Sequence, residues 1–160
     1  LVDEVILLEC MFENHPYEQV AYQIYGLDNV CTDIGSGVIG TIKKEMNSDK
    51  FLLFLKEKMK TNCIRHTALD KKKIKKVAIC GGSGSFLLED AKNQDADIFI
   101  SSDFKYHEFF DADNKIIIAD IGHFESEQYT KELIYDLLSE KFTKFAVQLS
   151  NVNTNPINYL

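Results

Sequence analysis

The spacing of hydrophobic positions changes along the chain, and each spacing predicts a different kind of element. Three short apolar runs have the length and the β-branched content of buried strands: Lys75 to Cys80, Ile98 to Ser101 and Ile116 to Ala119. Segments long enough for helical crossovers separate these runs, so we expect the three strands to lie parallel in one sheet. The pattern therefore predicts the α/β fold class.

Further helices and strands are expected on both sides of these runs. The expected helices are Val2 to Asn14, Asp49 to Lys60 entered through Ser48 as N-cap, Phe86 to Ala91, a short one near Asp103 to Phe110, and one that begins near His123 and continues past Leu138. The expected additional strands are Val20 to Tyr25, Gly35 to Ile42, Arg65 to Leu69 and Phe145 to Leu149. The last helix carries an apolar stripe that should pack on the sheet: Tyr129, Leu133, Ile134, Leu137 and Leu138.

A histidine and a glutamate follow the third buried strand, in the segment KIIIADIGHFESE of residues 115–127. In an open α/β sheet, ligands bind outside the carboxyl ends of the strands. If a helix starts near His123, the i, i+4 spacing puts His123 and Glu127 on one face, and this pair of side chains binds borderline divalent metals. The spacing equally allows ordinary structural roles, with Glu127 complementing the helix dipole and His123 capping or packing.

Polar residues also follow the other two buried strands. Asp103 and His107 repeat the i, i+4 spacing and would line the same site, where they could orient a ligand or transfer protons. Their ordinary roles would be an N-cap and a half-buried histidine. The segment GGSGS of residues 81–85 could bring backbone amides close to an anion, but it lacks a P-loop lysine and the G-x-G-x-x-G spacing. A tight turn with Ser83 or Ser85 as N-cap is the simpler interpretation.

Composition excludes several classes of function. The chain has 160 residues, is 45% hydrophobic and contains no apolar run long enough to cross a bilayer. Its formal net charge of −7 argues against broad contact with nucleic acid, despite the basic run KKKIKK at residues 71–76. The four cysteines, Cys10, Cys31, Cys63 and Cys80, have no C-x-x-C spacing, which favours a reducing compartment. We therefore expect a cytoplasmic protein with neither membrane nor nucleic acid as partner.

Six motifs together resemble the NIF-three-like family. They are HPYEQVAYQIYGLDN (15–29), GSGVIGTI (35–42), KKVAICGGSGSFLLEDA (75–91), DIFISSDFKYHEFFDA (97–112), IIIADIGHFESEQ (116–128) and TNPI (154–157). The resemblance implies a layered α/β/α fold with a largely parallel or mixed sheet. It also implies that residues 1–30 are the C-terminal remnant of an inserted small α+β domain, and that residues 31–160 form the C-terminal α/β domain.

Proteins of this family, often named GTP cyclohydrolase I type 2, have a dinuclear metal centre. The family's GH-F/Y-x-x-E element supplies two ligands, and the matching positions here are His123 and Glu127. The other ligands, an adjacent histidine pair and an aspartate, come from an N-terminal half. The histidines of this chain are His15, His66, His107 and His123, and none is adjacent to another. We therefore expect a C-terminal portion with half of the site, which by itself binds metal weakly or not at all.

The resemblance implies a metal-dependent hydrolase with two divalent ions per intact protomer, and the sequence does not distinguish zinc, iron and manganese. The alternative is a non-catalytic, metal-binding oligomeric scaffold or regulatory protein. A third interpretation is a nucleotide-binding module that uses GGSGS without metal. The family forms homo-oligomers, often ring-shaped hexamers. We expect such contacts through the first thirty residues, whose helix has the apolar positions Val2, Val5, Ile6 and Met11.

Overall fold

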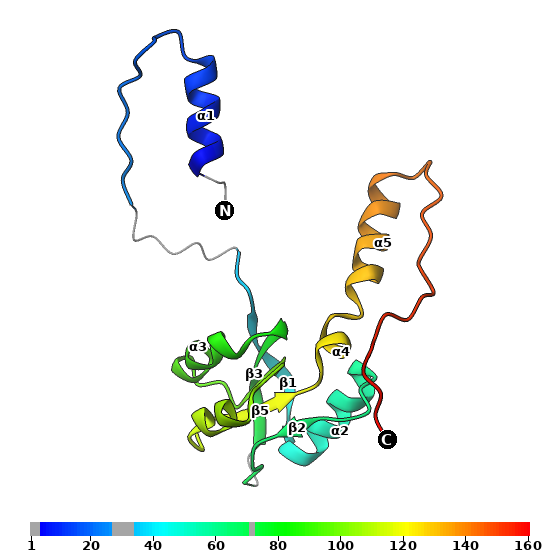
Figure 1. Cartoon of the computed structure of the whole chain (residues 1–160). Helices are drawn as coiled ribbons and strands as arrows, with labels where there is room; N and C mark the ends of the chain where they lie inside the picture. Colours follow the sequence, from blue (N-terminus) through cyan, green and yellow to red (C-terminus); the bar gives the residue numbers. More distant parts are fainter. Residues whose placement is uncertain (1–3, 27–33, 71–72) are drawn as a thin grey trace. The chain divides into compact units, whose positions relative to one another are not determined.

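A computed structural model describes residues 4–26, 34–70 and 73–160 of the chain, which divides into two units, Leu1–Asp33 and Ile34–Leu160 (Figure 1). In the described part of the first unit, helix α1 (Glu4–Asn14) is followed by residues 15–26 without regular structure. The predicted strand at Val20 to Tyr25 is therefore wrong. An alternating pattern forms a strand only where another strand supplies hydrogen bonds, and none pairs with this segment in the described residues. The origin of this unit as the remnant of an inserted domain remains a prediction.

Five strands of the second unit form one mixed sheet in the order β1-β3-β4-β5-β2. Their bounds are Val38–Asn47 for β1, Arg65–His66 for β2, Lys73–Ser83 for β3, Ile98–Ser102 for β4 and Ile117–Asp120 for β5. The three central strands, β3, β4 and β5, are parallel, and the two edge strands are antiparallel to their neighbours. The prediction of three parallel strands in one α/β sheet is confirmed.

Helices cover both faces of the sheet, which gives the expected α/β/α layers (Figure 1). Helix α2 (Ser48–Met59) packs on one face through Phe51, Leu52 and Leu55. On the other face lie α3 (Leu88–Asn93), which follows the short 3-10 helix η1 (Ser85–Leu87), and the 3-10 helix η2 (Tyr106–Ala112). Side chains of strand β4 pack in both layers, because successive side chains of a strand point to opposite faces of the sheet.

Several element boundaries differ from the predicted ones. Strand β3 continues through Ser83, so the first two glycines of GGSGS belong to the strand and not to a turn. Strand β1 extends to Asn47, whereas β2 contains only Arg65 and His66. Asn47 occupies the N-cap position of α2, and Ser48 is the first helical residue, whose hydroxyl donates to the carbonyl of Leu69 at 3.3 Å. The prediction of Ser48 as N-cap is therefore wrong by one position.

The helix predicted from His123 past Leu138 forms as two helices, α4 (His123–Glu127) and α5 (Thr130–Lys141), and α5 does not bury its apolar stripe. No residue of α5 is buried, and Leu133, Ile134 and Leu137 are 60, 50 and 58% exposed. The periodicity identified an apolar face correctly, but periodicity cannot identify what covers such a face. Residues 142–160 form no strand, so the predicted strand at Phe145 to Leu149 is also wrong, since this segment pairs with neither edge of the sheet.

No helix among the described residues is long and apolar enough to cross a membrane. Helix α1 buries none of its residues, and its exposed side chains include Val5 and Ile6. Homo-oligomeric contact through the first unit remains a prediction.

Some of the residues discussed from the sequence lie outside the described ranges: Val2, Cys31, Lys71 and Lys72. Within those ranges, Cys10, Cys63 and Cys80 are free thiols.

The sheet core should dominate the stability of the second unit, and α5 should contribute little. Ile118 of β5 is fully buried, so Ile118→Ala should lower the free energy of unfolding by about 2–5 kcal/mol through lost burial and a residual cavity. Leu137→Ala on α5 is the matched control and should change the free energy of unfolding by less than about 0.5 kcal/mol, because Leu137 is exposed. Urea unfolding of both variants measures the difference, and equal losses would show that α5 is packed against the rest of the protein.

Candidate functional site

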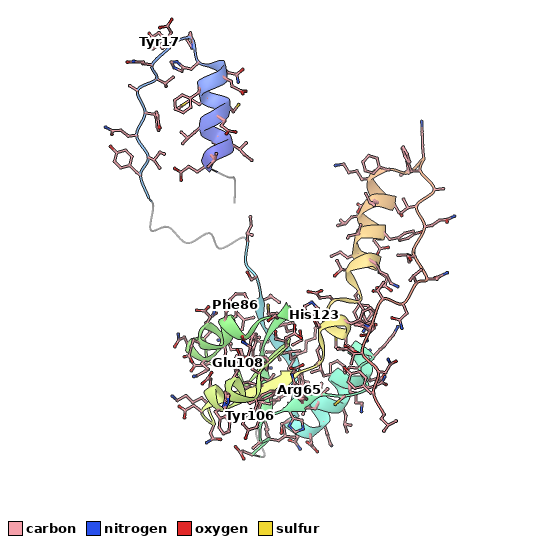
Figure 2. All side chains as sticks on the ribbon, viewed as in Figure 1. Tyr17, Arg65, Phe86, Tyr106, Glu108 and His123 are labelled. Atoms are coloured by element: carbon pink, nitrogen blue, oxygen red, sulfur yellow. The ribbon has the colours of Figure 1, made fainter. Side chains whose placement is uncertain are left out.

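The short helix α4 (His123–Glu127) follows β5 through a sharp change of direction at Gly122. Gly122 has φ +92°, and a Cβ there would lie 2.3 Å from Oε2 of Glu125, so the turn requires glycine. One helical turn then places His123 Nε2 3.3 Å from Glu127 Oε2. The two residues therefore share one face of α4, as their spacing predicts. Figure 2 shows His123 where the chain leaves the sheet.

Asp103 reaches the same imidazole from the loop after β4. Its Oδ2 lies 2.5 Å from His123 Nδ1, and its backbone is in the left-handed region with φ +59°. When the neutral imidazole carries its proton on Nδ1 and donates a hydrogen bond to this carboxylate, Nε2 has a free lone pair on the side of Glu127. The imidazole thus lies between two carboxylates, and all three side chains are about half-exposed.

These carboxylates favour the protonated form of the imidazole. The pKa of His123 is raised above its ordinary value of 6.5, first by the hydrogen bond with Asp103, against a smaller opposing effect of partial burial. The negative charges of Asp103 and Glu127 add to the increase. A divalent ion at Nε2 would have to displace this proton, so metal and proton compete for the same lone pair.

The buried carboxylate of Asp120 positions both loops of the site. Its Oδ2 accepts a hydrogen bond from the amide of Phe104 at 3.1 Å, and its Oδ1 accepts one from the amide of Gly122 at 3.1 Å. Phe104 directly follows Asp103, and Gly122 directly precedes His123. One side chain at the end of β5 therefore holds the residues next to Asp103 and His123, which contact each other.

Strand β3 supports α4 from the other side. The amide of Gly82 donates to the hydroxyl of Ser126 at 2.8 Å, and this hydroxyl donates to the carbonyl of His123 at 2.8 Å. Gly82 has φ +65°, and a Cβ there would lie 2.4 Å from Oε1 of Glu127. The glycines of GGSGS thus allow close packing of α4, and the Gly82 amide is already bonded within the protein.

The predicted serine caps do not form. Gly84 occupies the N-cap position of η1, and no side chain caps this helix. The hydroxyl of Ser85 instead donates to Oε1 of Glu108 on η2 at 3.2 Å. Neither Ser83 nor Ser85 therefore acts as the expected N-cap.

His107 does not join the other three residues. It is exposed on η2, where its ring packs edge-on against Tyr106 with 5.2 Å between ring centroids, and it makes no described contact with Asp103, His123 or Glu127. The i, i+4 spacing brings Asp103 and His107 together only on an α-helix, but η2 is a 3-10 helix with Lys105 at its N-cap position. Asp103 therefore does not cap η2. The assignment of His107 to proton transfer remains a prediction.

A cavity of about 590 Å³ adjoins the site and includes His123 and Glu127 in its lining. Helix α5 contributes Ile134 to its wall, and the C-terminal segment contributes residues 154–157. The side-chain amide of Asn155 donates to Oε1 of the buried Glu125 at 3.2 Å, which holds this segment against α4. The volume is in the range of small-molecule sites.

The described residues offer only part of a metal site. No group of three or more histidine, cysteine, aspartate or glutamate side chains among them is arranged to hold a metal ion. His123 Nε2 and the Glu127 carboxylate supply one nitrogen and one oxygen donor, a combination that suits zinc and similar divalent metals. Further donors would have to come from outside the described residues.

Sequence reasoning missed the residues that fix this geometry. Asp120 closes a buried strand, and an acid at such a position was the available signal for a buried hydrogen-bond acceptor. Ser126 and Gly82 lie in IIIADIGHFESEQ and GGSGS, but nothing in either motif predicts the hydrogen bond between the two residues.

The chain matches known proteins over nearly its whole length. Residues 5–156 match the family profile Duf34/NIF3 (NGG1p interacting factor 3). The GTP cyclohydrolase 1 type 2 homolog of Bacillus subtilis is 34% identical over 162 residues, which cover 98% of this chain and 43% of that protein. The homolog from Staphylococcus epidermidis is 33% identical over 159 residues, which cover 96% of this chain and 43% of that protein. The chain thus spans less than half the length of these relatives.

Solved structures give the same result. A Bacillus cereus protein related to NIF3 superimposes with a TM-score of 0.70 at 28% identity, covering 98% of this chain and 44% of that chain. A Staphylococcus aureus protein superimposes with a TM-score of 0.72 at 26% identity, covering 98% of this chain and 46% of that chain. The resemblance predicted from six motifs is confirmed.

Replacing Asp103 should lower the pKa of His123. In Asp103→Asn the carboxylate that favours the imidazolium is lost, so the pKa should fall towards 6.5, and Glu127→Gln should lower it less, because Asp103 is the main cause of the increase. An NMR pH titration of the imidazole resonances in the presence of a chelator measures both variants. A raised folded-state pKa stabilises the protein below the unfolded pKa, and this contribution is lost as the pH rises through the folded pKa. An unchanged pKa in Asp103→Asn would show that the contact is absent in solution.

Proposed function

Because the chain belongs to the Duf34/NIF3 family, we propose that it carries half of the dinuclear metal site of a hydrolase-type enzyme, with His123 and Glu127 as ligands. The observation that carries this proposal is the imidazole of His123, which lies between Asp103 and Glu127. The remaining ligands would come from residues outside this chain.

The geometry suits metal ligation in two respects. The gap between His123 Nε2 and Glu127 Oε2 is 3.3 Å, so small side-chain movements would let both atoms contact one ion in place of a proton. Asp103 holds the opposite nitrogen of the ring, and a carboxylate in this position fixes the tautomer and makes Nε2 a stronger donor. Asp103 would therefore orient the ligand and would not itself contact the metal.

When bound, a pair of divalent ions polarises a phosphate or carbonyl oxygen and lowers the pKa of a water molecule. The adjoining cavity would hold the substrate beside His123 and Glu127. Lys131 lines this cavity and supplies a cation, which suits an anionic substrate such as a phosphate ester. The names of the relatives refer to GTP, but no residue of this chain can be assigned to the recognition of guanine.

A non-catalytic metal-binding scaffold is the second candidate. The exposed apolar face of α5 favours it, because such a face is typical of a surface that contacts another protein. In this case the metal would stabilise an assembly without turning over a substrate. Metal-dependent turnover of a nucleotide or another phosphate ester by the intact protein distinguishes the two functions.

Metal content tests the proposed ligands directly. In the intact protein, His123→Ala and Glu127→Ala should each lower the metal content sharply, because each removes one donor, whereas Glu132→Ala, an exposed acid on α5, should not. Circular dichroism should show an unchanged fold, since neither ligand belongs to the apolar core. Elemental analysis measures the bound metal. If both variants retain the wild-type metal content, His123 and Glu127 are not ligands.

The two neighbouring glycines of β3 allow a test in which neither ligand residue is replaced. A Cβ at Gly82 would displace the Glu127 carboxylate, whereas a Cβ at Gly81 would lie in ordinary contact, 3.7 Å from Glu127 Cγ. Gly82→Ala should therefore weaken metal binding by the intact protein about tenfold, in the range for a disturbed ligand environment, and Gly81→Ala should not. Titration with zinc against a competing chelator measures both affinities. Equal affinities would show that metal binding does not depend on the position of Glu127.

A further inference from the structure

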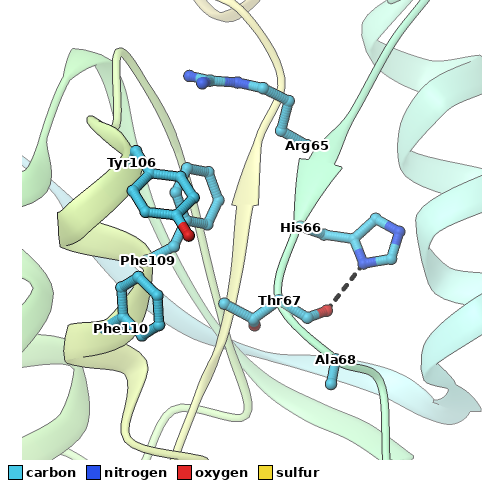
Figure 3. Close-up of a pocket in the computed structure, with 7 residues that line it drawn as sticks. All are labelled: Arg65, His66, Thr67, Ala68, Tyr106, Phe109 and Phe110. Carbon is cyan, nitrogen blue, oxygen red and sulfur yellow. Dashed lines mark hydrogen bonds between the residues drawn. The ribbon is translucent and has the colours of Figure 1, made fainter.

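A second cavity, of about 410 Å³, lies between η2 and the segment that contains β2 (Figure 3). Tyr106, Phe109 and Phe110 line it from η2, and residues 65–68 line it from the opposite side. The volume suits a small organic molecule, and the lining is mainly apolar with few polar groups, as in most ligand sites. None of its lining residues belongs to the proposed metal site.

Arg65 provides a fixed cationic group at one end of this cavity. Its Nη2 donates to the carbonyl of Phe104 at 3.0 Å and to the buried carboxylate of Asp120. Its guanidinium lies over the ring of Phe109, 5.4 Å from the centroid. Both protons of Nη2 are thus used, and the three N–H groups on Nε and Nη1 have no hydrogen-bond partner among the described residues. A guanidinium held in this way can bind an anion without a further loss of side-chain entropy.

The aromatic rings of this cavity are unusually exposed. Tyr106 and Phe110 are 72 and 67% exposed, and their rings meet edge to face with 5.4 Å between centroids. Large aromatic side chains on a short helix leave apolar surface in water, and clustered surface of this kind is typical of a binding site. Such rings bind planar partners by stacking.

The charged side chains differ between the two ends of this cavity. A smaller cavity of about 230 Å³ continues from the first, shares Phe109 and Phe110 with it, and has Asp70 and Asp113 in its lining. Arg65 is paired with Asp120, and Asp113 is paired with Lys115, so these charges are partly offset. An anion is still favoured at the Arg65 end, because N–H groups of Arg65 remain free to donate to it, whereas the side chains of Asp70 and Asp113 offer only acceptors. A ligand would thus bind in one direction, with its anionic group at Arg65.

We propose that the cavity lined by Arg65, Tyr106 and Phe110 binds a small planar aromatic molecule that carries a phosphate or carboxylate group. The anionic group pairs with the free edge of the Arg65 guanidinium. The ring packs against Tyr106 and Phe110, face-on to one and edge-on to the other, because those two rings are inclined at 75°. Binding at this site does not require metal at His123.

The full chain in a buffer with chelator is titrated with 1-naphthyl phosphate, and the amide resonances are followed by NMR. Saturable shifts of the amide resonances of residues 65–68 and 106–110 are expected. 1-Naphthol and inorganic phosphate should bind more weakly, because 1-naphthol lacks the anionic group and inorganic phosphate lacks the aromatic ring. Phe110→Ala should weaken binding about fivefold by loss of stacking. Phe86→Ala, which removes a phenylalanine that is 66% exposed and does not line this cavity, should have no effect.

The arginine is tested by Arg65→Lys, which keeps a cation near the buried Asp120 but loses the planar fork. The preference for 1-naphthyl phosphate over 1-naphthol should fall about tenfold. The proposal is overturned if the shifts lie elsewhere or do not saturate, if 1-naphthol or inorganic phosphate binds as tightly as 1-naphthyl phosphate, or if Phe110→Ala and Phe86→Ala behave alike. Metal is absent throughout, so these results are independent of the proposed metal ligands.

Discussion

The loops that carry Asp103 and His123 are held at one edge of the sheet by the buried carboxylate of Asp120. Its two oxygens accept hydrogen bonds from the amides of Phe104 and Gly122 and from the guanidinium of Arg65. A buried carboxylate is stable only when such donors surround it, and here the donors come from the loop after β4, the loop after β5 and the edge strand β2. The need to satisfy one charge thus fixes three separate segments of the chain at the same edge of the sheet.

This arrangement explains why reactive groups lie where the parallel strands end. Strands β4 and β5 run in the same direction, so the loops that follow them start side by side, and backbone in the left-handed region at Asp103 and Gly122 turns both loops towards each other. Left-handed backbone is unfavourable for a residue such as Asp103. It persists at this position because neighbouring hydrogen bonds hold the loop.

The three central strands and the pairing of His123 with Glu127 could be predicted from the sequence, because they depend on local periodicity and spacing. The layers were expected only from the resemblance to the family. The contact between Asp103 and His123 could be anticipated only as a convergence of strand ends, since the two residues lie 20 positions apart. The spacing of Asp103 and His107 was misleading, because it presupposed an α-helix where a 3-10 helix forms. The hydrogen bonds of Asp120 and Ser126 and the exposure of α5 depend on tertiary packing, which no local pattern contains.

The uncovered apolar face of α5 has a consequence for the behaviour of this chain in solution. Association through Leu133, Ile134 and Leu137 would follow the thermodynamics of hydrophobic surface, so it would weaken on cooling and strengthen in sulfate. Association through charged surface would respond in the opposite way to salt, because ions screen it. The dependence on temperature and on the choice of salt would therefore distinguish association through this apolar face from association through charged surface.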